Sequence, residues 1–285
     1  MVEHSPPPRE AVAAADAACG GQVELTAVSD RRGSSVFRAD GPNGVVALKT
    51  GTGPGAATTA REAEALRQLD WDGYLLGAGL LDGISWMVTP WFDAPSTYAL
   101  FEPVRQGRGP GRAREAAVAF CQAVGELHAS GWVHGDLQAA HALHTDNGVK
   151  LIDLAWARRD GFEVPGTFKG GVVHLLAPEL AAQATAGADR LFVTAEAEVY
   201  SLAGALWTSA TGAWPLDYPA IGIDRTAVTP DRLRAVIAYG VPLTGIVRWR
   251  ALQDVLREVL LSHPADRPTA AELGVEVAAL SGSRS

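Results

Sequence analysis

Two aspartates occupy positions where a carboxylate could do chemistry. Asp136 lies in Trp132–Leu137, a tight turn that follows a long predicted helix, and Asp153 ends the apolar strand Val149–Ile152. An aspartate at the end of a buried strand is costly unless it meets a cation or fixed hydrogen-bond donors. The residues between them predict a hairpin turning at Asp146–Gly148, which would bring both carboxylates to the same edge of the lobe. A lone aspartate would be an ordinary turn or N-cap residue, but the convergence of two favours a functional pair.

The elements that position these aspartates divide near residues 90–96. Before that boundary, short strands, hairpin turns and one helix predict a small strand-rich region. The expected elements are strands at Leu25–Ala39 and Val45–Thr50 around a Gly41–Gly44 turn, a flexible loop at 51–59, a helix at Ala60–Leu69, and a hairpin of Leu75–Leu81 and Ile84–Thr89 around Asp82-Gly83.

After the boundary, apolar residues recur at helical spacing and predict a larger, mainly helical region. The expected helices are Ala113–Ser130, Val199–Ala210, Thr229–Tyr239, Arg248–Ser262 and Ala270–Leu280. The predicted fold class is therefore α+β. Residues 1–20 are expected to form a flexible tail or leading helix, residues 21–92 the small lobe and residues 93–281 the large lobe; within the tail, 1–10 are expected to be loose.

Composition narrows the class of function. The 285 residues carry a formal net charge of −8, with 47% hydrophobic and 20% charged residues, which is typical of a folded globular protein. The acidic balance argues against a nucleic-acid partner, and no apolar run is long enough to span a membrane. Cys19 and Cys121 stand apart, so we expect two reduced, buried thiols and no zinc site. With no secretory signal at the start, a cytoplasmic location is expected.

Seven segments, in order and at near-family spacing, resemble the motifs of the protein-kinase superfamily over about residues 25–275. They are Val46–Lys49, Arg61–Leu66, Leu127–Leu137, Val149–Ala155, Ala177–Glu179, Val199–Gly204 and Asp266–Thr269. One such motif would be weak, whereas seven in the family's order are specific. The resemblance implies a bilobal kinase-like fold with a β-rich N-terminal lobe.

The resemblance also implies roles for single residues. Lys49 would bind the α- and β-phosphates of ATP, and Glu62 would hold its ammonium group. Glu64 is the competing partner, but it lies about 200° round the helix from Glu62, so only one of them can face Lys49. Asp136 would accept the proton of the attacking hydroxyl, and Asp153 would ligate Mg²⁺.

Further residues follow from the same resemblance. Gly33, Ser34 and Ser35 would cap the phosphates, although the family's three glycines are reduced to one. The adenine is expected at Thr89–Phe92, so that Thr89, Trp91 and Phe92 belong to the nucleotide site. Outside the site, His134 would support the loop backbone, and Glu179 would form a buried structural ion pair with Arg267.

Several positions depart from the family's pattern. His141 stands where an asparagine usually ligates a second Mg²⁺; an imidazole suits Mn²⁺ better, so that metal is either bound unusually or absent. Gln138 replaces a lysine that contacts the transferred phosphate, and Gly135 replaces the arginine before the catalytic aspartate. Ala155 replaces the glycine of the metal-binding triplet, which restricts the backbone there, and Val172 replaces a threonine. Glu198 replaces a helix-opening aspartate.

These observations predict a phosphotransferase that uses ATP with Mg²⁺, or alternatively Mn²⁺. The expected acceptor is a Ser or Thr hydroxyl of a protein or peptide, with Asp136, Lys49 and Gln138 as catalytic residues and Asp153 and His141 as metal ligands. Two alternatives remain open. The His134-Gly135-Asp136 triplet also resembles small-molecule kinases such as aminoglycoside phosphotransferases, and the departures from the pattern leave room for a pseudokinase that binds nucleotide or a partner without catalysis.

Overall fold

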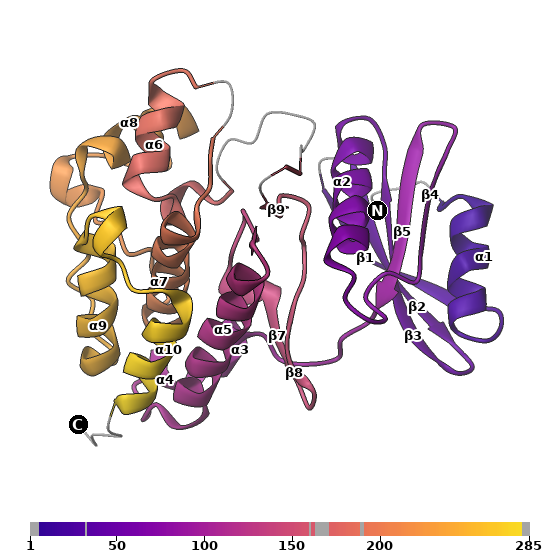
Figure 1. The fold of residues 1–285 in the computed structure, drawn as a ribbon, viewed down its shortest axis with the longest axis horizontal. Helices are drawn as coiled ribbons and strands as arrows, with labels where there is room; N and C mark the ends of the chain where they lie inside the picture. The colour runs from indigo at the N-terminus through magenta and orange to yellow at the C-terminus, as the bar shows by residue number, and fades with distance from the viewer. Residues whose placement is uncertain (1–5, 32, 160, 163–170, 189–190, 281–285) are drawn as a thin grey trace. The chain divides into compact units, whose positions relative to one another are not determined.

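The computed structural model describes residues 6–31, 33–159, 161–162, 171–188 and 191–280 (Figure 1). They form two compact units. The first takes the described residues up to Asp93 together with Asp153–Ala157, and the second takes the others. The first unit contains a five-stranded sheet and the second is mainly helical, so the predicted α+β class is confirmed and is consistent with a kinase-like fold.

The sheet of the first unit is antiparallel throughout, in the order β1-β2-β3-β5-β4. Its strands are β1 (Glu24–Arg31), β2 (Ser34–Gly41), β3 (Gly44–Gly51), β4 (Gly77–Leu81) and β5 (Ile84–Pro90). The turns at Gly41–Gly44 and at Asp82-Gly83 lie where the sequence predicts them. Asp82 and Gly83, with φ of 50° and 79°, form the left-handed turn that an Asp-Gly pair favours between β4 and β5.

The segment predicted as one strand, Leu25–Ala39, is two antiparallel strands, and Arg31 at the end of the first pairs with Ser34 at the start of the second. The polar run before Val36 is therefore mostly strand rather than an open loop. Ser34 and Ser35 pair with Gly51 and Thr50 of β3.

Helices α1 (Arg9–Ala18) and α2 (Pro54–Leu69) cover opposite faces of this sheet (Figure 1). Because side chains alternate along a strand, Leu48 packs into the cluster that includes Ala11 and Ala15 of α1, while Lys49 faces α2.

Both helices begin earlier than predicted. The expected loose tail over 1–10 is wrong at its end, where Arg9 and Glu10 open α1. The expected flexible loop over 51–59 is also wrong from Pro54 onward. Proline is well suited to the first turn of a helix, because its missing N–H would have no partner there.

In the second unit, helices surround α7 (Ala195–Thr211), whose side chains are nearly all buried. The others are α3 (Thr97–Leu100), α4 (Glu102–Arg105), α5 (Gly111–Ala129), α6 (Pro178–Thr185), α8 (Pro230–Tyr239), α9 (Arg250–Leu261) and α10 (Ala270–Ala279). α5 packs along α10, α9 packs against α7, and α6 packs against α8. None of the helices in the described ranges has the length and apolar character needed to cross a membrane.

Two short pairs of strands carry the loop regions of this unit. β7 (Ala142–Thr145) and β8 (Gly148–Leu151) form the hairpin predicted between the two aspartates, and β6 (Trp132–Val133) pairs with β9 (Arg158–Arg159). Short 3₁₀ helices lie at Ala139–His141, Val173–Leu175, Pro219–Ile221 and Pro264–Asp266. Both cysteines are buried free thiols, as expected.

The predicted ion pair of the large lobe is confirmed. The Arg267 guanidinium donates to both carboxylate oxygens of Glu179, at 2.6 and 3.0 Å, and to the carbonyl of Glu196. The Arg267 side chain is 2% exposed, so it depends on these partners to offset its lost hydration.

We therefore expect Arg267→Ala to lower the free energy of unfolding by about 3 kcal/mol, since it leaves Glu179 without its cation. Arg67→Ala is the control, because its ion pair with Glu64 is about half exposed on both sides and is worth less than about 1 kcal/mol. Urea unfolding followed by circular dichroism measures both. Equal losses in the two variants would contradict a structural role specific to Arg267.

Candidate active site

Lys49 lies between two carboxylates of its own unit. Its Nζ atom is 2.5 Å from Oε2 of Glu62 on α2 and 3.2 Å from Oδ1 of Asp153. Glu64 faces away and bonds to Arg67 and Gln68 on the helix surface. Of the two glutamates left open by the sequence, Glu62 is thus the partner of Lys49.

The second oxygen of Glu62 also has a partner. Its Oε1 atom accepts a hydrogen bond of 3.2 Å from the backbone N–H of Leu154, the residue after Asp153. The side chain is 6% exposed, so both of its oxygens replace lost water with fixed donors. One buried carboxylate therefore joins β3, α2 and the segment that carries Asp153.

Lys49 remains a cation in this setting. Burial alone lowers the pKa of its ammonium group, but Glu62 and Asp153 outweigh that effect and hold the pKa above its ordinary value. Such a cation is suited to bind an anion such as a phosphate.

Asp153 has an unusual backbone, with φ of +62°. Left-handed geometry in a residue other than glycine is uncommon and is often found at functional sites. The side chain is 42% exposed, which leaves room for a ligand beside Lys49. Among described residues other than glycine, only Asp70, Asp82 and Asp153 have positive φ, so Ala155 does not need the freedom of the glycine it replaces.

Arg61, the neighbour of Glu62, fixes the same segment from a second direction. Its Nε donates to the carbonyl of Ala155 at 3.3 Å, and its guanidinium lies 3.9 Å from the ring centre of Trp156. Sequence reasoning did not assign Arg61 a role. Its place beside Glu62 on the same helix was the available signal.

In the second unit, two hydrogen bonds to one oxygen fix the carboxylate of Asp136. Oδ1 accepts from Nε2 of Gln138 at 3.3 Å and from the backbone N–H of Val172 at 3.2 Å. Within the described part of the chain, Oδ2 has no hydrogen-bond partner. Because Val172 acts through its backbone, the loss of a threonine there does not remove the contact.

Gly171 makes this contact possible. It has φ of +48°, and a Cβ atom there would lie 2.5 Å from Oδ1 of Asp136. Any larger residue would therefore push against the carboxylate or displace Val172. The two successive glycines at 170 and 171 were the sequence signal, and sequence reasoning missed it.

The loop that carries Asp136 rests on a second buried glutamate. Glu198, 1% exposed in the first turn of α7, accepts from the backbone N–H groups of His134 and Gly135 at 2.9 and 2.8 Å, and contacts Nε2 of His128 at 2.9 Å. Burial raises the pKa of Glu198, but the hydrogen bond from His128 and the charges and donors around it hold the pKa below its ordinary value. This role was also missed, although an acidic residue before an apolar helix was a visible signal.

His134 is fully buried, and its Nε2 lies 3.0 Å from the carbonyl oxygen of Ile152. Its Nδ1 also accepts from the backbone N–H of Asp136 at 3.4 Å, so it contacts the loop backbone as expected. His141 stacks on it, with ring centres 5.8 Å apart.

Nδ1 of His141 lies 3.1 Å from the carbonyl oxygen of Asp136. Since a carbonyl only accepts, a neutral ring carries its hydrogen on Nδ1 and its lone pair on Nε2, the tautomer that a metal ligand needs. In the described ranges, however, no group of three or more His, Cys, Asp or Glu could hold a metal ion. The carboxylate of Asp153 fits Mg²⁺, which in nucleotide sites takes one or two carboxylates and completes its shell with phosphate and water oxygens.

The residues expected around the phosphates lie at the tip of the β1–β2 hairpin. The carbonyl oxygen of Gly33, with φ of +79°, accepts from the N–H of Thr52 at 2.8 Å. A Cβ atom on Gly55 would lie 2.1 Å from that oxygen, so the hairpin tip and the start of α2 touch through glycine backbone. The hairpin is thereby tied to the helix that carries Glu62.

The residues expected around the adenine follow β5. Thr89 pairs with Ala47 in the sheet, and the ring of Phe92 packs 5.5 Å from that of Tyr74. The N–H of Trp91 already donates to the carbonyl of Val45 at 3.2 Å. The N–H of Trp91 therefore already has a hydrogen-bond partner within the first unit.

Comparison with known proteins agrees with a distant kinase-like relationship. Over 156 residues, 53% of the chain, it is 27% identical to the dual specificity protein kinase Ttk of Danio rerio. The match covers 15% of that protein, so the chain spans a small part of the relative's length. No family model matches the chain. The similarity, with the α+β architecture, is consistent with a kinase-like fold.

The role of Glu198 can be tested through stability. In Glu198→Gln, an amide N–H₂ must face one of the buried donors, so we expect a loss of about 2–3 kcal/mol in the free energy of unfolding. Glu126→Gln, an exposed change on α5, should stay within about 0.5 kcal/mol. Urea titration at neutral pH compares the two. A loss no larger than that of the control would mean that the loop does not depend on this carboxylate.

The same variant has a pH signature. Because the pKa of Glu198 in the folded state is below its ordinary value of 4.5, its contribution is complete above pH 4.5 and is lost as the pH falls through the folded pKa. The wild-type chain should therefore lose more stability than Glu198→Gln between neutral pH and pH 3. Parallel profiles would contradict the assignment.

Proposed function

We propose that the protein is an ATP- and metal-dependent phosphotransferase that acts on a Ser or Thr hydroxyl of a protein or peptide. The observation that carries the proposal is the bridge made by Glu62, which holds Lys49 with one oxygen and the N–H after Asp153 with the other. This bridge keeps a partly buried cation next to a more exposed carboxylate. A cation and a metal-binding carboxylate are what a triphosphate needs.

In this proposal the first unit handles the nucleotide. Lys49 binds the α- and β-phosphate oxygens and keeps its charge through Glu62. Asp153 would hold the metal, and Nε2 of His141, which belongs to the second unit, is the other candidate ligand. When bound, the metal supplies positive charge that neutralises the phosphates as the terminal group leaves.

The second unit handles the acceptor. Oδ2 of Asp136 takes the proton of the acceptor hydroxyl, while Oδ1 is fixed by Gln138 and Val172. The hydroxyl oxygen forms a bond to the γ-phosphorus as the bond to the β,γ-bridging oxygen breaks. ADP leaves with that electron pair, and the products are a phosphate ester and the protonated Asp136.

A protein acceptor is favoured because the matched relative is a protein kinase. Small hydroxylated molecules are the second acceptor class, favoured by Gly135 in place of the usual arginine. A nucleotide-binding protein without transfer is the other alternative, and it is favoured by the two hydrogen bonds that Oδ1 of Asp136 takes from its own chain.

Three substitutions test the proposal. Asp136→Asn and Asp153→Asn should each lower phosphate transfer to serine peptides at least about 100-fold, because each removes a group that acts in the transition state. Lys49→Met should also weaken ATP binding. Transfer of labelled phosphate, with thermal stabilisation by ATP and Mg²⁺, measures both effects. Asp146→Asn, in the exposed β7–β8 turn, is the control.

The outcomes separate the alternatives. Stabilisation by ATP that needs Lys49, without transfer to any peptide or small hydroxylated acceptor, would replace the proposal with nucleotide binding alone. Transfer to small hydroxylated molecules, but not to peptides, would show that the acceptor is a small molecule. Activity of the Asp136 and Asp153 variants equal to that of Asp146→Asn would contradict the proposed site.

His141 allows a separate test of the metal. If its imidazole ligates the ion, His141→Asn should raise the ratio of activity with Mg²⁺ to activity with Mn²⁺ several-fold, because an amide oxygen suits the harder cation. An unchanged ratio would show that the ring only packs on His134 and holds the carbonyl of Asp136.

A further inference from the structure

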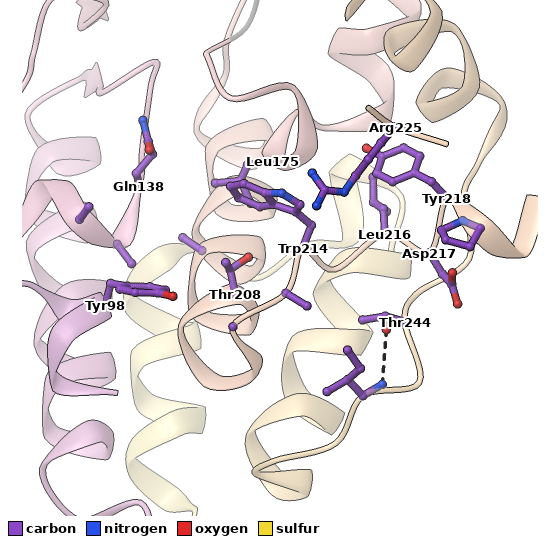
Figure 2. Close-up of a pocket in the computed structure, with 17 residues that line it drawn as sticks. Tyr98, Gln138, Leu175, Thr208, Trp214, Leu216, Asp217, Tyr218, Arg225 and Thr244 are labelled. Atoms are coloured by element: carbon purple, nitrogen blue, oxygen red, sulfur yellow. Dashed lines mark hydrogen bonds between the residues drawn. The ribbon is translucent and has the colours of Figure 1, made fainter. Parts of the chain in front are cut away.

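The second unit contains a cavity of about 680 Å³ beside the end of α7 (Figure 2). This volume lies within the range of about 300–1,000 Å³ that is typical of ligand sites. Its walls come from the start of α3, the loop after Asp136, the end of α7, the segment that follows α7 and the loop before α9. The residues used below are Tyr98, Gln138, Trp214, Asp217, Tyr218 and Arg225.

The cavity is adjacent to the proposed catalytic aspartate. Gln138 belongs to its wall, and Nε2 of the same side chain is 3.3 Å from Oδ1 of Asp136. A molecule that presents a hydroxyl to Asp136 can therefore extend past Gln138 into the cavity. We therefore consider the cavity as a site for another part of the acceptor molecule.

The walls are mainly apolar and aromatic, and the cationic side chain among the described lining residues is Arg225. Within the described part of the chain, its guanidinium has no hydrogen-bond or ion-pair partner. Figure 2 shows it directed toward Trp214 and away from the carboxylate of Asp217. That carboxylate accepts from the N–H of Ala220 at 3.2 Å instead.

Asp224, the carboxylate next to Arg225 in the chain, bonds to Thr226; these hydrogen bonds, and then the charge of Arg225, hold its pKa below its ordinary value. His174 lies behind the wall, with Nδ1 3.0 Å from the hydroxyl of Tyr218 and its ring centre 4.9 Å from that of Trp214. Burial, and then the charge of Arg225, lower the pKa of His174 to about 4, so this ring is neutral at pH 7. The cavity thus combines aromatic walls with one cation that forms no hydrogen bond or ion pair with the described residues.

We propose that this cavity binds the acceptor peptide and that Arg225 selects an acidic residue, Asp or Glu, near the hydroxyl that is phosphorylated. The inference rests on the proposed function. Arg225 offers planar N–H donors that match a carboxylate, and the aromatic walls take the apolar parts of the segment. Since the chain has a formal net charge of −8, an acidic peptide gains nothing from the overall charge, and its recognition depends on this local cation.

Paired peptides test the inference. In a series of serine peptides, a single Glu is moved through the positions on either side of the Ser, and each peptide has a Gln counterpart. We expect at least one position where Glu raises kcat/KM about tenfold over Gln, as a charged hydrogen bond would. Arg225→Gln should bring that ratio close to one, and Arg225→Glu should favour a Lys at the same position. Arg232→Gln, an exposed arginine outside the cavity, should keep the wild-type ratio.

A binding measurement separates this inference from the proposed function. Fluorescence anisotropy of the labelled Glu peptide on the full chain should show an affinity that falls in Arg225→Gln but not in Arg232→Gln. Binding of this kind without transfer would support the cavity while the phosphotransferase proposal fails. Transfer that ignores both the Glu and Arg225 would overturn the cavity's role while the function stands. Inorganic phosphate is the second probe. If phosphate displaces the Glu and Gln peptides equally well, Arg225 binds anions in general and does not select the acidic residue, which would also overturn the inference.

Discussion

The candidate site depends on one buried carboxylate that must satisfy two donors at once. Glu62 loses nearly all of its hydration, a cost that a single ion pair does not reliably offset. It is stable because one oxygen meets the ammonium of Lys49 and the other meets the backbone N–H of Leu154. Moving α2, β3 or the segment after Asp153 would leave a buried charge incompletely paired, so this constraint fixes all three elements together.

The second unit uses the same physical device. Glu198 is buried at the start of α7, and its two oxygens accept the backbone N–H groups of the loop before Asp136. In each unit, therefore, the candidate aspartate is positioned through backbone that a buried glutamate holds. The side chain of Asp153 is partly exposed, and Oδ2 of Asp136 has no hydrogen-bond partner in the described residues. The residues that fix the backbone are thus different from the candidate site residues.

Part of the fold could be predicted because its signals are local. The Asp82-Gly83 turn requires left-handed geometry that few residues adopt, and the long helices show apolar residues at regular spacing. The errors lie where local signals are weak. The start of α2 has no polar N-cap, and its first turn, Pro54-Gly55-Ala56, suggests a loop. Between β1 and β2 the sequence offers a single glycine, Gly33, as a turn signal. The spacing of residues alone therefore could not show that residues 25–39 form two strands.

By itself, the sequence determined the class of fold, the order of the motifs and the residue types able to bind phosphate, metal and a hydroxyl proton. These follow from composition, spacing and side-chain chemistry, which are properties of short segments. Only the tertiary structure decided that Glu62 rather than Glu64 pairs with Lys49, that Val172 reaches Asp136 through its backbone and that Arg225 lines a cavity. Each of these is a contact between residues far apart in the chain. Packing and desolvation select such contacts, and they cannot be predicted from the pattern of residues in a short segment.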